Sequence, residues 1–356
     1  MKNLLLMFAA VLIFASCSNN ANEGTTDVKV VEKAEISAAG ATFPLPFYNI
    51  AFKNYAETNN AEITYGGIGS GGGIRSLKDK VVDFGATDAF LDEEKEAEMP
   101  AAIVHIPTCI GAVVIAYNLP GIESLSLSSQ NLEDIFMGNI KNWNDAKLAE
   151  TNPDVTLPNM EISLIHRSDG SGTTYIFSDY MSKISTKWEA EIGRGKSLNW
   201  PVGMGAKGNP GVAGTIQQTE GSIGYIGSEF AFAQKISFAK LENASGNYIE
   251  PSIASISASA QGDIPTDTKV MLTNSSDPNA YPICGFTWLI IYKDQKYDSR
   301  TLAQAEATVK LLSWMIEKDA QAIAQQVQYA PLPEKAVTQA KAILGSVVYE
   351  GVPVLK

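Results

Sequence analysis

Residues 162–181, ISLIHRSDGSGTTYIFSDYM, carry the clearest structural signal in this chain. They begin with an apolar segment of strand length (162–166) and continue through a polar loop rich in glycine and hydroxyl groups (167–174). They end in a segment (175–181) whose apolar residues stand three and four apart, as in a packed helix. A buried strand that leads directly into a helix is the repeating unit of α/β proteins, so the sequence predicts an α/β fold.

The same alternation of apolar runs and helical patterns extends in both directions. Short apolar runs that predict buried strands occupy residues 63–65, 81–86, 112–117, 223–226 and 289–292. Helical spacing predicts helices over 46–55, 74–81 and 311–327, the last with Leu312, Met315, Ile316, Ile323 and Val327 on one face.

Two similar segments, PTCIG at 107–111 and PICGF at 282–286, each lead from a proline toward a long apolar strand. If both cross between two lobes, residues 34–111 and 283–356 form lobe 1 and residues 112–282 form lobe 2. Ligands of open α/β folds bind at the carboxyl ends of strands, which points to the cleft between the lobes. The segments hold Cys109 and Cys284, which could pair in an exported protein or stay as buried free thiols.

The first 17 residues read as an export signal, with Lys2 before the apolar run 4–14, which is too short to span a bilayer. The sequence FASC at 14–17 resembles a bacterial lipoprotein cleavage box, although Phe14 replaces the usual aliphatic residue. We therefore expect lipid attachment at Cys17; an ordinary signal peptide with a chance cysteine is the alternative. Residues 18–33 are polar and without apolar period, which is typical of a flexible tether.

The chain is acidic, with 27 Lys and Arg against 39 Asp and Glu and a net charge of −12, or −13 once Lys2 is lost with the signal. This balance argues against a nucleic-acid partner, because such binding depends on basic residues that neutralise phosphates. Any anion site in this protein must work through local dipoles and not through net charge.

Three loops have the character of anion sites. The segment HRSDGSGTT at 166–174 places Ser171, Gly172 and Thr173 at a helix start, where free N–H groups and the helix dipole favour anions, and Arg167 adds a cation. The segment GGIGSGGG at 66–73 holds Ser70 between a strand and a helix. The segment AGATFP at 39–44 holds Thr42 and Phe43 before a proline that can open a helix. Together they favour one oxyanion site.

Asp88, at the end of VDFGATD (82–88), follows an apolar strand and could be either a surface turn residue or a residue of the anion site. In an anion site it indicates which oxyanion is bound. A carboxylate repels an anion unless the ligand carries a proton to donate. Monohydrogen phosphate carries such a proton and sulfate at neutral pH does not. A polar mismatch of this kind costs factors on the order of 10⁴ to 10⁵.

Together these segments resemble the PstS family, the periplasmic phosphate-binding component of the high-affinity phosphate ABC transporter. The resemblance runs in order through 40–44, 67–72, 82–88, 138–143 (GNIKNW), 167–173, 200–203 (WPVG), 207–209 (KGN) and 224–226 (GYI). It departs from the family at Thr87, where serine is commoner, and at the two cysteines of the crossing segments.

The resemblance implies a type II periplasmic binding protein fold with two hinge crossings and no catalytic residue, cofactor or metal. The ligand residues it implies are Thr42, Phe43 and Ser70 from lobe 1, Arg167, Ser171, Gly172 and Thr173 from lobe 2, and Asp88 as acceptor of the phosphate proton. It further implies that Asp169 holds Arg167 in place. The implied protein is a monomer in the periplasm or cell envelope, anchored at Cys17, that delivers phosphate to the permease subunits.

Three other functions remain open. A dehydrogenase would use 67–72 as a dinucleotide fingerprint with Asp88 downstream, but His105 and His166 are the only histidines available for acid–base chemistry. An exported phosphatase would use Ser171 as nucleophile but lacks an evident base or metal pair. A binder of sulfate or another oxyanion, or a phosphate sensor without transport, would use the same loops.

Overall fold

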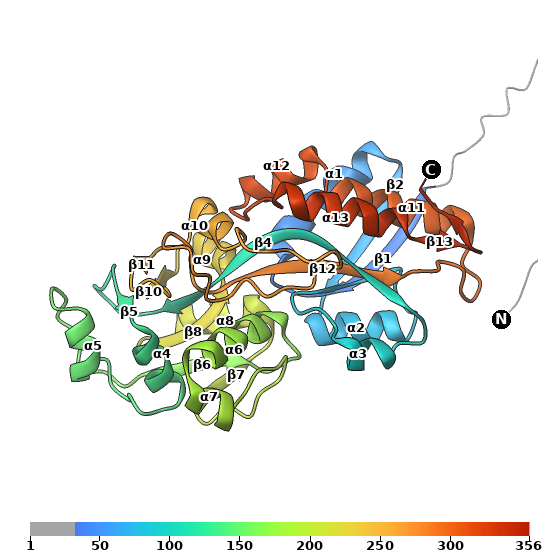
Figure 1. Cartoon of the computed structure of the whole chain (residues 1–356). Helices are drawn as coiled ribbons and strands as arrows, with labels where there is room; N and C mark the ends of the chain where they lie inside the picture. The colour runs from blue at the N-terminus through green and yellow to red at the C-terminus, as the bar shows by residue number, and fades with distance from the viewer. Residues whose placement is uncertain (1–32, 356) are drawn as a thin grey trace, which may run out of the picture. The chain divides into compact units, whose positions relative to one another are not determined.

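One long strand, β4 (Ile103–Tyr117), joins the two halves of the main sheet in the computed structural model, which describes residues 33–355. Within those residues the sheet has nine strands in the order β2-β1-β3-β12-β4-β8-β6-β7, and β9 also pairs with β4. Residues 103–112 of β4 pair antiparallel with β12 (Cys284–Tyr292), and residues 113–117 pair antiparallel with β8 (Ser222–Gly227). Figure 1 shows β4 and β12 running side by side through the middle of the fold.

The remaining strands are shorter and complete the main sheet or form small satellite sheets. In the main sheet they are β1 (Ala34–Gly40), β2 (Ala61–Gly67), β3 (Phe84–Thr87), β6 (Ser163–Arg167), β7 (Met204–Ala206) and β9 (Ser237–Phe238). Outside it are β5 (Ser126–Leu127), β10 (Lys240–Glu242) and β11 (Tyr248–Ile249), and the pair β13 (Val348–Tyr349) and β14 (Val352–Pro353).

Helices follow most strands, as the α/β pattern predicts. In the first part of the chain they are α1 (Leu45–Thr58), α2 (Ser70–Lys78), α3 (Glu93–Ala97), α4 (Ser129–Phe136), α5 (Ala146–Thr151) and α6 (Gly172–Ile184). They continue with α7 (Thr186–Glu191), α8 (Gly208–Gln218), α9 (Ser228–Gln234), α10 (Ile253–Ala258), α11 (Leu302–Met315), α12 (Lys318–Gln326) and α13 (Glu334–Gly345). The α/β prediction is confirmed.

The first half of the sheet consists of β2, β1, β3, β12 and residues 103–112 of β4. Strands β2, β1 and β3 run parallel, and Figure 1 shows α1, α11, α12 and α13 over one side of them and α2 and α3 on the other. Helix α2 lies very close to the sheet, since a Cβ at Gly73 would stand 2.5 Å from the Cα of Gly40 and 2.6 Å from the carbonyl oxygen of Ala39. Only glycine allows this approach, which sets the start of α2 beside the ends of β1 and β3.

The second half of the sheet consists of residues 113–117 of β4 with β8, β9, β6 and β7. Strands β8, β6 and β7 run parallel, so the loops after β6 and before α8 emerge at the same edge of the sheet. Apolar side chains bury this half tightly, and Trp143, Trp188 and Tyr225 each have 0 % of their surface exposed. The buried core thereby holds the loop ends in place.

Several segment boundaries differ from the sequence prediction. The expected helix over 311–327 is wrong as a single element, because α11 ends at Met315 and α12 begins at Lys318. Gln321 explains the break: its Nε2 donates to the carbonyl oxygen of Met315 at 2.8 Å and to that of Thr108 in β4 at 2.8 Å. The second helix is therefore turned toward the sheet.

Helix α2 and strand β3 are each displaced along the chain relative to the predictions 74–81 and 81–86. The helix starts four residues earlier, at Ser70, and the strand starts at Phe84. Val81, placed in both predicted segments, lies in neither and is 68 % exposed.

The two cysteines of the crossing segments are buried free thiols, which answers the question that the sequence left open. They lie on paired strands but not opposite one another, since Cys109 stands across from Thr287 and Cys284 across from Ala112. Burial raises the pKa of the Cys284 thiol to about 12 and that of Cys109 well above its ordinary value.

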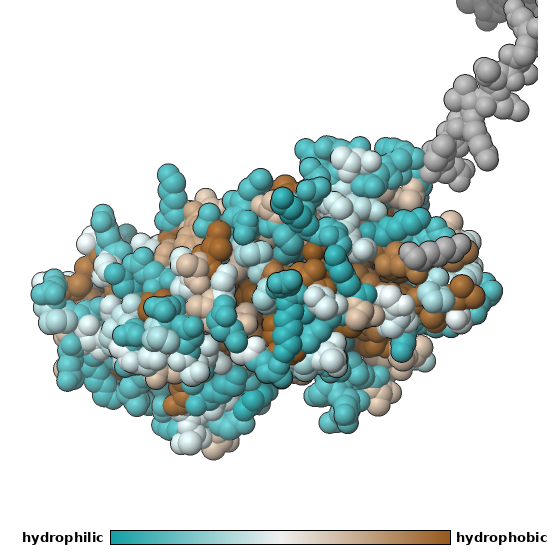
Figure 2. Space-filling view, turned by 45° about the horizontal axis from the view of Figure 1, so that its top comes forward, coloured by the Kyte–Doolittle hydropathy of each residue, from teal (hydrophilic) through white to brown (hydrophobic). Residues whose placement is uncertain are grey.

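No helix within residues 33–355 combines the length and the apolar character needed to cross a membrane. Figure 2 shows one face covered mostly by hydrophilic residues, with hydrophobic residues in smaller patches between them. The predicted export signal, the lipidation site Cys17 and nearly all of the predicted tether fall in residues 1–32, outside the described residues.

Candidate functional site

The loop after β6 ends in the amide-rich start of α6, as the sequence predicts. Ser171 is the N-cap of this helix, and its Oγ accepts a hydrogen bond from the backbone N–H of Thr174 at 3.0 Å. The cap keeps the following turn rigid and leaves the N–H of Gly172 directed outward. That N–H donates to Oγ of Ser70, at 3.1 Å, in the opposite half of the sheet.

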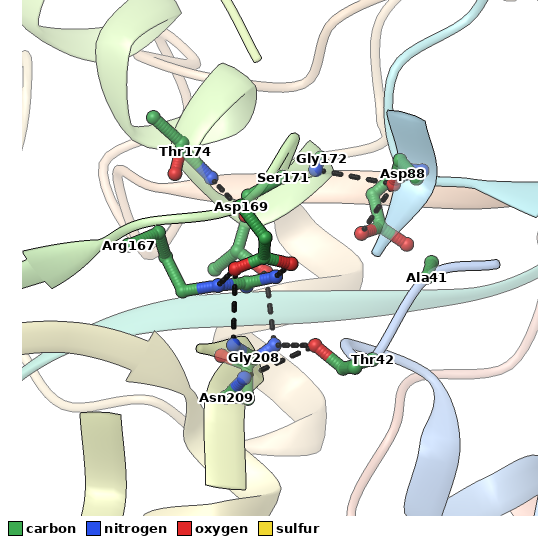
Figure 3. Close-up of polar contacts among 12 residues, drawn as sticks. Ala41, Thr42, Asp88, Arg167, Asp169, Ser171, Gly172, Thr174, Gly208 and Asn209 are labelled. Atoms are coloured by element: carbon green, nitrogen blue, oxygen red, sulfur yellow. Dashed lines mark hydrogen bonds and ion pairs between the residues drawn. The ribbon is translucent and has the colours of Figure 1, made fainter. Parts of the chain in front are cut away.

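Ser70 is the point at which the two halves meet. It is the first residue of α2, behind Gly69, whose φ of +84° is easily adopted only by glycine. Its Oγ accepts from the N–H of Gly172 and from the N–H of Asp88 at 3.2 Å, and donates to Oδ2 of Asp88 at 3.3 Å. Figure 3 shows Asp88 and Gly172 facing one another across this contact.

Asp88 follows β3 and is 1 % exposed. Its Oδ1 accepts a hydrogen bond from the hydroxyl of Thr287 on β12. Burial raises the pKa of Asp88 to about 7, against the opposing effects of the Thr287 hydrogen bond, the Arg167 charge and the Ser70 hydrogen bond. This carboxyl can therefore be an acceptor or a donor near neutral pH.

Arg167 lies at the end of β6 and is held in a forked ion pair. Its Nε donates to Oδ1 of Asp169 at 2.8 Å and its Nη2 to Oδ2 at 2.7 Å, while its Nη1 donates to Oγ1 of Thr173 at 3.2 Å. Although burial alone would raise it, the pKa of Asp169 is lowered by the hydrogen bonds and charge of Arg167 and by the N–H of Gly208. Asp169 is therefore an ionised partner that orients the guanidinium.

Thr42 and Phe43 stand before α1, on the first half of the sheet. Oγ1 of Thr42 accepts from both the backbone N–H and Nδ2 of Asn209, each at 3.1 Å. The ring of Phe43 packs so closely on β4 and β8 that a Cβ at Gly111 would lie 2.4 Å from it and a Cβ at Gly227 would lie 3.0 Å from it. Phe43 is thus wedged at the junction of the two halves.

The structure gathers the predicted site residues into one buried region. Hydrogen bonds join them in two groups. Ser70, Asp88 and Gly172 form the first, and Thr42, Arg167 and Thr173 form the second through Asn209. Ser171 caps the helix that carries both Gly172 and Thr173, and Phe43 is buried at the junction of the two halves. Each of these side chains is at most 4 % exposed, and Gly172 is buried as well. The start of α6 contacts the start of α2 through Gly172 and Ser70, and the start of α8 contacts Thr42, which precedes α1, through Asn209. The positive dipole ends of these helices favour a negative ligand despite the acidic net charge.

Sequence reasoning missed two residues that bond to the predicted site residues, namely Thr287, which bonds to Asp88, and Asn209, which bonds to Thr42 and Thr173. Thr287 sits within the apolar run 286–292, and a lone hydroxyl in a buried strand is the signal that could have identified it. Asn209 follows Lys207 and Gly208 at the start of α8 and is buried. A buried amide needs hydrogen-bond partners, and its place at a helix start is the signal that could have identified it.

Neither histidine is placed for acid–base chemistry at Ser171. His166 stacks on Trp200, with ring centroids 4.8 Å apart and planes at 13°, which is a packing role. Nε2 of His105 accepts from the N–H of Leu91 at 3.1 Å, and burial lowers the pKa of this imidazole to about 3. The hydroxyl of Ser171 is itself engaged as a helix cap.

Comparison with known proteins identifies the family. Residues 7–319 match the PBP superfamily domain. The chain is 36% identical over 359 residues to the phosphate-binding protein PstS of Xylella fastidiosa, covering 96% of this chain and 97% of the relative. It is 33% identical over 353 residues to the PstS of Methanocaldococcus jannaschii, covering 93% and 90%.

Two solved structures show the same fold at lower sequence identity. A high-affinity periplasmic phosphate-binding protein, PfluDING, bound with phosphate, has a TM-score of 0.69 at 20% identity and covers 88% of this chain and 99% of its own. A putative phosphate ABC transporter substrate-binding protein from Clostridium perfringens, with bound phosphate, has a TM-score of 0.61 at 16% identity and covers 84% and 100%. The fold is that of a periplasmic binding protein.

These matches span nearly the whole chain, and the relatives are solute-binding proteins and not enzymes. Three of the segments that carry the sequence resemblance, 67–72, 82–88 and 167–173, meet at Ser70, Asp88 and Gly172. The chain belongs to the PstS family of phosphate-binding proteins within the PBP superfamily.

Proposed function

We propose that this protein binds inorganic phosphate with high affinity outside the cytoplasmic membrane and delivers it to the permease of an ABC transporter. The names of its relatives support this function, as does the phosphate bound in the similar structures from Clostridium perfringens and of PfluDING. The chemistry of the buried residues Ser70, Asp88 and Gly172 supports it independently.

The anion contacts of this proposal come from the convergent loops. The donors are the hydroxyls of Thr42, Ser70, Ser171 and Thr173, the amides of Phe43, Gly172 and Thr173, and the guanidinium of Arg167, with Asp88 as the acceptor of the phosphate proton. The hydroxyl of Ser70 and the amide of Gly172, which bond to Asp88 and Ser70 in this structure, turn to the anion when it binds. Hydrogen bonds to charged groups contribute roughly 1.5–3 kcal/mol each, so about ten exceed the roughly 8 kcal/mol of micromolar binding. The surplus offsets dehydration of the anion.

One observation carries the proposal. Oγ of Ser70 lies 3.1 Å from the N–H of Gly172 and 3.3 Å from Oδ2 of Asp88, so a helix start from each half meets at one buried carboxyl group. Helix starts attract any oxyanion, whereas a buried carboxylate accepts only an anion that has a proton to give. Monohydrogen and dihydrogen phosphate meet both conditions.

Closure of two lobes is the second part of the proposal. Residues 34–111 with 283–356 form one lobe and residues 112–282 form the other, with β4 and β12 as the crossings. The change of partner along β4, from β12 up to residue 112 to β8 from residue 113, supports this boundary. The liganded, closed form then presents the surface that the permease recognises.

Calorimetric titration of the purified protein with phosphate, arsenate and sulfate tests the anion assignment. We expect one tight site for phosphate and nearly equal affinity for arsenate, which shares its shape and protonation. Sulfate is expected to bind at least a thousandfold more weakly than phosphate at pH 8, because it has no proton to give to the buried acceptor. Equal competition by sulfate would overturn the assignment of Asp88.

We further propose that the protein is a monomer held in the periplasm or cell envelope by a lipid on Cys17. The support for the anchor is the sequence alone, namely the FASC box at 14–17 and the polar segment 18–33. The monomeric state is proposed from the resemblance to the PstS family. The expected product is a chain that begins at Cys17 and carries acyl chains. Mass spectrometry of the amino-terminal peptide from membranes checks this, and an unmodified peptide that retains residues 1–16 contradicts it.

A further inference from the structure

Asn209 is a buried amide that bonds two residues of the proposed ligand set but does not itself belong to that set. It is the second residue of α8, follows Gly208 with its φ of +70°, and is 0 % exposed. A side chain with two donors and an acceptor, fully removed from water, must have partners. Its partners are the two threonines of the proposed phosphate site.

The orientation of this amide is determined by its neighbours. Oδ1 accepts the backbone N–H of Gly227 at 2.9 Å, which requires the carbonyl end of the side chain to face β8. Nδ2 therefore faces the other way, where it donates to Oγ1 of Thr42 at 3.1 Å and to Oγ1 of Thr173 at 3.0 Å. One amide group thereby spans two hydroxyls from opposite halves of the sheet (Figure 3 shows Thr42 directed at Asn209).

The acceptor capacity of both hydroxyls is filled by these bonds. A hydroxyl oxygen has two lone pairs and one proton. Oγ1 of Thr42 accepts from the N–H and from Nδ2 of Asn209, and Oγ1 of Thr173 accepts from Nδ2 of Asn209 and from Nη1 of Arg167. Each proton must then point away from those donors, and within residues 33–355 neither hydroxyl donates a hydrogen bond to the protein.

We propose that Asn209 is a positioning residue that turns the hydroxyls of Thr42 and Thr173 into obligate donors aimed at the anion. This inference rests on the proposed phosphate site. Without the amide, Thr42 keeps only the backbone N–H of residue 209 as a donor and Thr173 keeps only Nη1 of Arg167. Each hydroxyl then has an unfilled lone pair that it can present to the ligand, which an anion repels. Asn209 thus favours anions over neutral ligands without touching them.

The same contacts make Asn209 a link between the halves of the fold. Thr42 precedes α1 in the first half, whereas Asn209 and Thr173 belong to the second. Along the chain, Asn209 is 167 residues from Thr42 and 36 residues from Thr173. The link to Thr42 exists only when the two halves are together. Loss of Asn209 is therefore expected to weaken phosphate binding through both hydroxyls at once.

The test is a double-mutant cycle read by calorimetric titration with inorganic phosphate. Asn209→Leu, similar in volume but with no donor, is expected to weaken binding by about 10- to 100-fold in the otherwise unchanged protein, as expected for one or two charge-assisted hydrogen bonds. In a protein that already carries Thr42→Val and Thr173→Val, the same substitution is expected to change the affinity by less than about threefold.

A purely structural role for Asn209 gives a different result. In that case Asn209→Leu weakens binding equally in both backgrounds, and this outcome overturns the inference. Asn243→Leu is the matched control, because this buried amide donates to the carbonyl oxygens of Pro278 and Ala280 away from the site. We expect it to lower the melting temperature and leave the phosphate affinity within about twofold.

Two further outcomes separate this inference from the proposed function. If the unmodified protein binds no phosphate, the proposed function itself fails; if it binds phosphate and Asn209→Leu binds as tightly, only the role of Asn209 fails. Should Asn209→Leu not fold, Asn209→Ala replaces it in the same cycle. Its smaller side chain also removes the amide but adds no bulk.

Discussion

The Asp88→Asn substitution is expected to reduce the preference for phosphate over sulfate at pH 8 by about a thousandfold or more, within the range given by mismatched buried polar groups. The ionised carboxyl accepts the proton of monohydrogen phosphate but faces an unprotonated oxygen in sulfate. In the variant, the new carbonyl can keep the hydrogen bond from Thr287 while the new NH₂ group turns toward Ser70 and the anion. That NH₂ group donates to sulfate.

The preference is also expected to depend on pH in the unmodified protein. Burial raises the pKa of Asp88 to about 7, so the protonated share of this carboxyl grows as the pH falls through that value. A protonated Asp88 donates a hydrogen bond, and sulfate should compete better at pH 6 than at pH 8. The Asp88→Asn variant should show no such dependence from this position, since its amide does not titrate.

Competition titrations with sulfate against bound phosphate at pH 6, 7 and 8 measure both effects. Asp179→Asn is the control, because Asp179 is a carboxylate of similar burial whose partners, Lys183 and Arg194, lie outside the site. It should leave the phosphate-to-sulfate ratio unchanged. An unchanged ratio in Asp88→Asn itself would remove Asp88 from the recognition of the anion.

Arg167→Ala is expected to weaken phosphate binding by roughly 100- to 1000-fold. This range corresponds to the free energy lost when one partner of a buried ion pair is removed. The guanidinium uses three of its five N–H groups on Asp169 and Thr173, which leaves two for the anion. Its removal also leaves the carboxylate of Asp169, whose side chain is 13% exposed, without its cation and near the ligand.

Two comparisons distinguish the lost contact from the exposed carboxylate. Adding Asp169→Ala to Arg167→Ala should recover part of the affinity, because the repulsive charge is then gone. Arg194→Ala removes an arginine paired with Asp179 at 3.0 Å, whose side chain is 41% exposed, and should change the phosphate affinity by less than about twofold. If titration shows that Arg167→Ala loses less than threefold in phosphate affinity, Arg167 has no direct role in binding.

The local conformation of the loops proposed to bind the anion was predictable because it depends on neighbouring residues. Ser171 caps α6 through the N–H of Thr174, three residues away, and Ser70 opens α2 directly after a glycine with positive φ. Glycine, a capping hydroxyl and the dipole of the following helix all lie within one turn of each other. A window of ten residues contains the whole argument.

The division of residues 311–327 into two helices was not predictable in this way. Apolar spacing is continuous through Ile316, so the local pattern favours one helix. The break depends on Gln321, which bonds at once to the carbonyl of Met315 and to that of Thr108, more than two hundred residues earlier in the chain. A contact at that distance leaves no periodic trace in the sequence.

The amino-acid order alone was sufficient for the α/β class and for the strand-to-helix loops that hold the proposed site residues, because strand, helix start and turn follow from neighbouring residues. The tertiary structure was needed to bring Thr287 to Asp88 across 199 residues and Asn209 to Thr42 across 167, and to bury Asp88 deeply enough to raise its pKa to about 7. Burial and long-range hydrogen bonds depend on which segments fold against one another, and that choice is made by the whole core and not by any single segment.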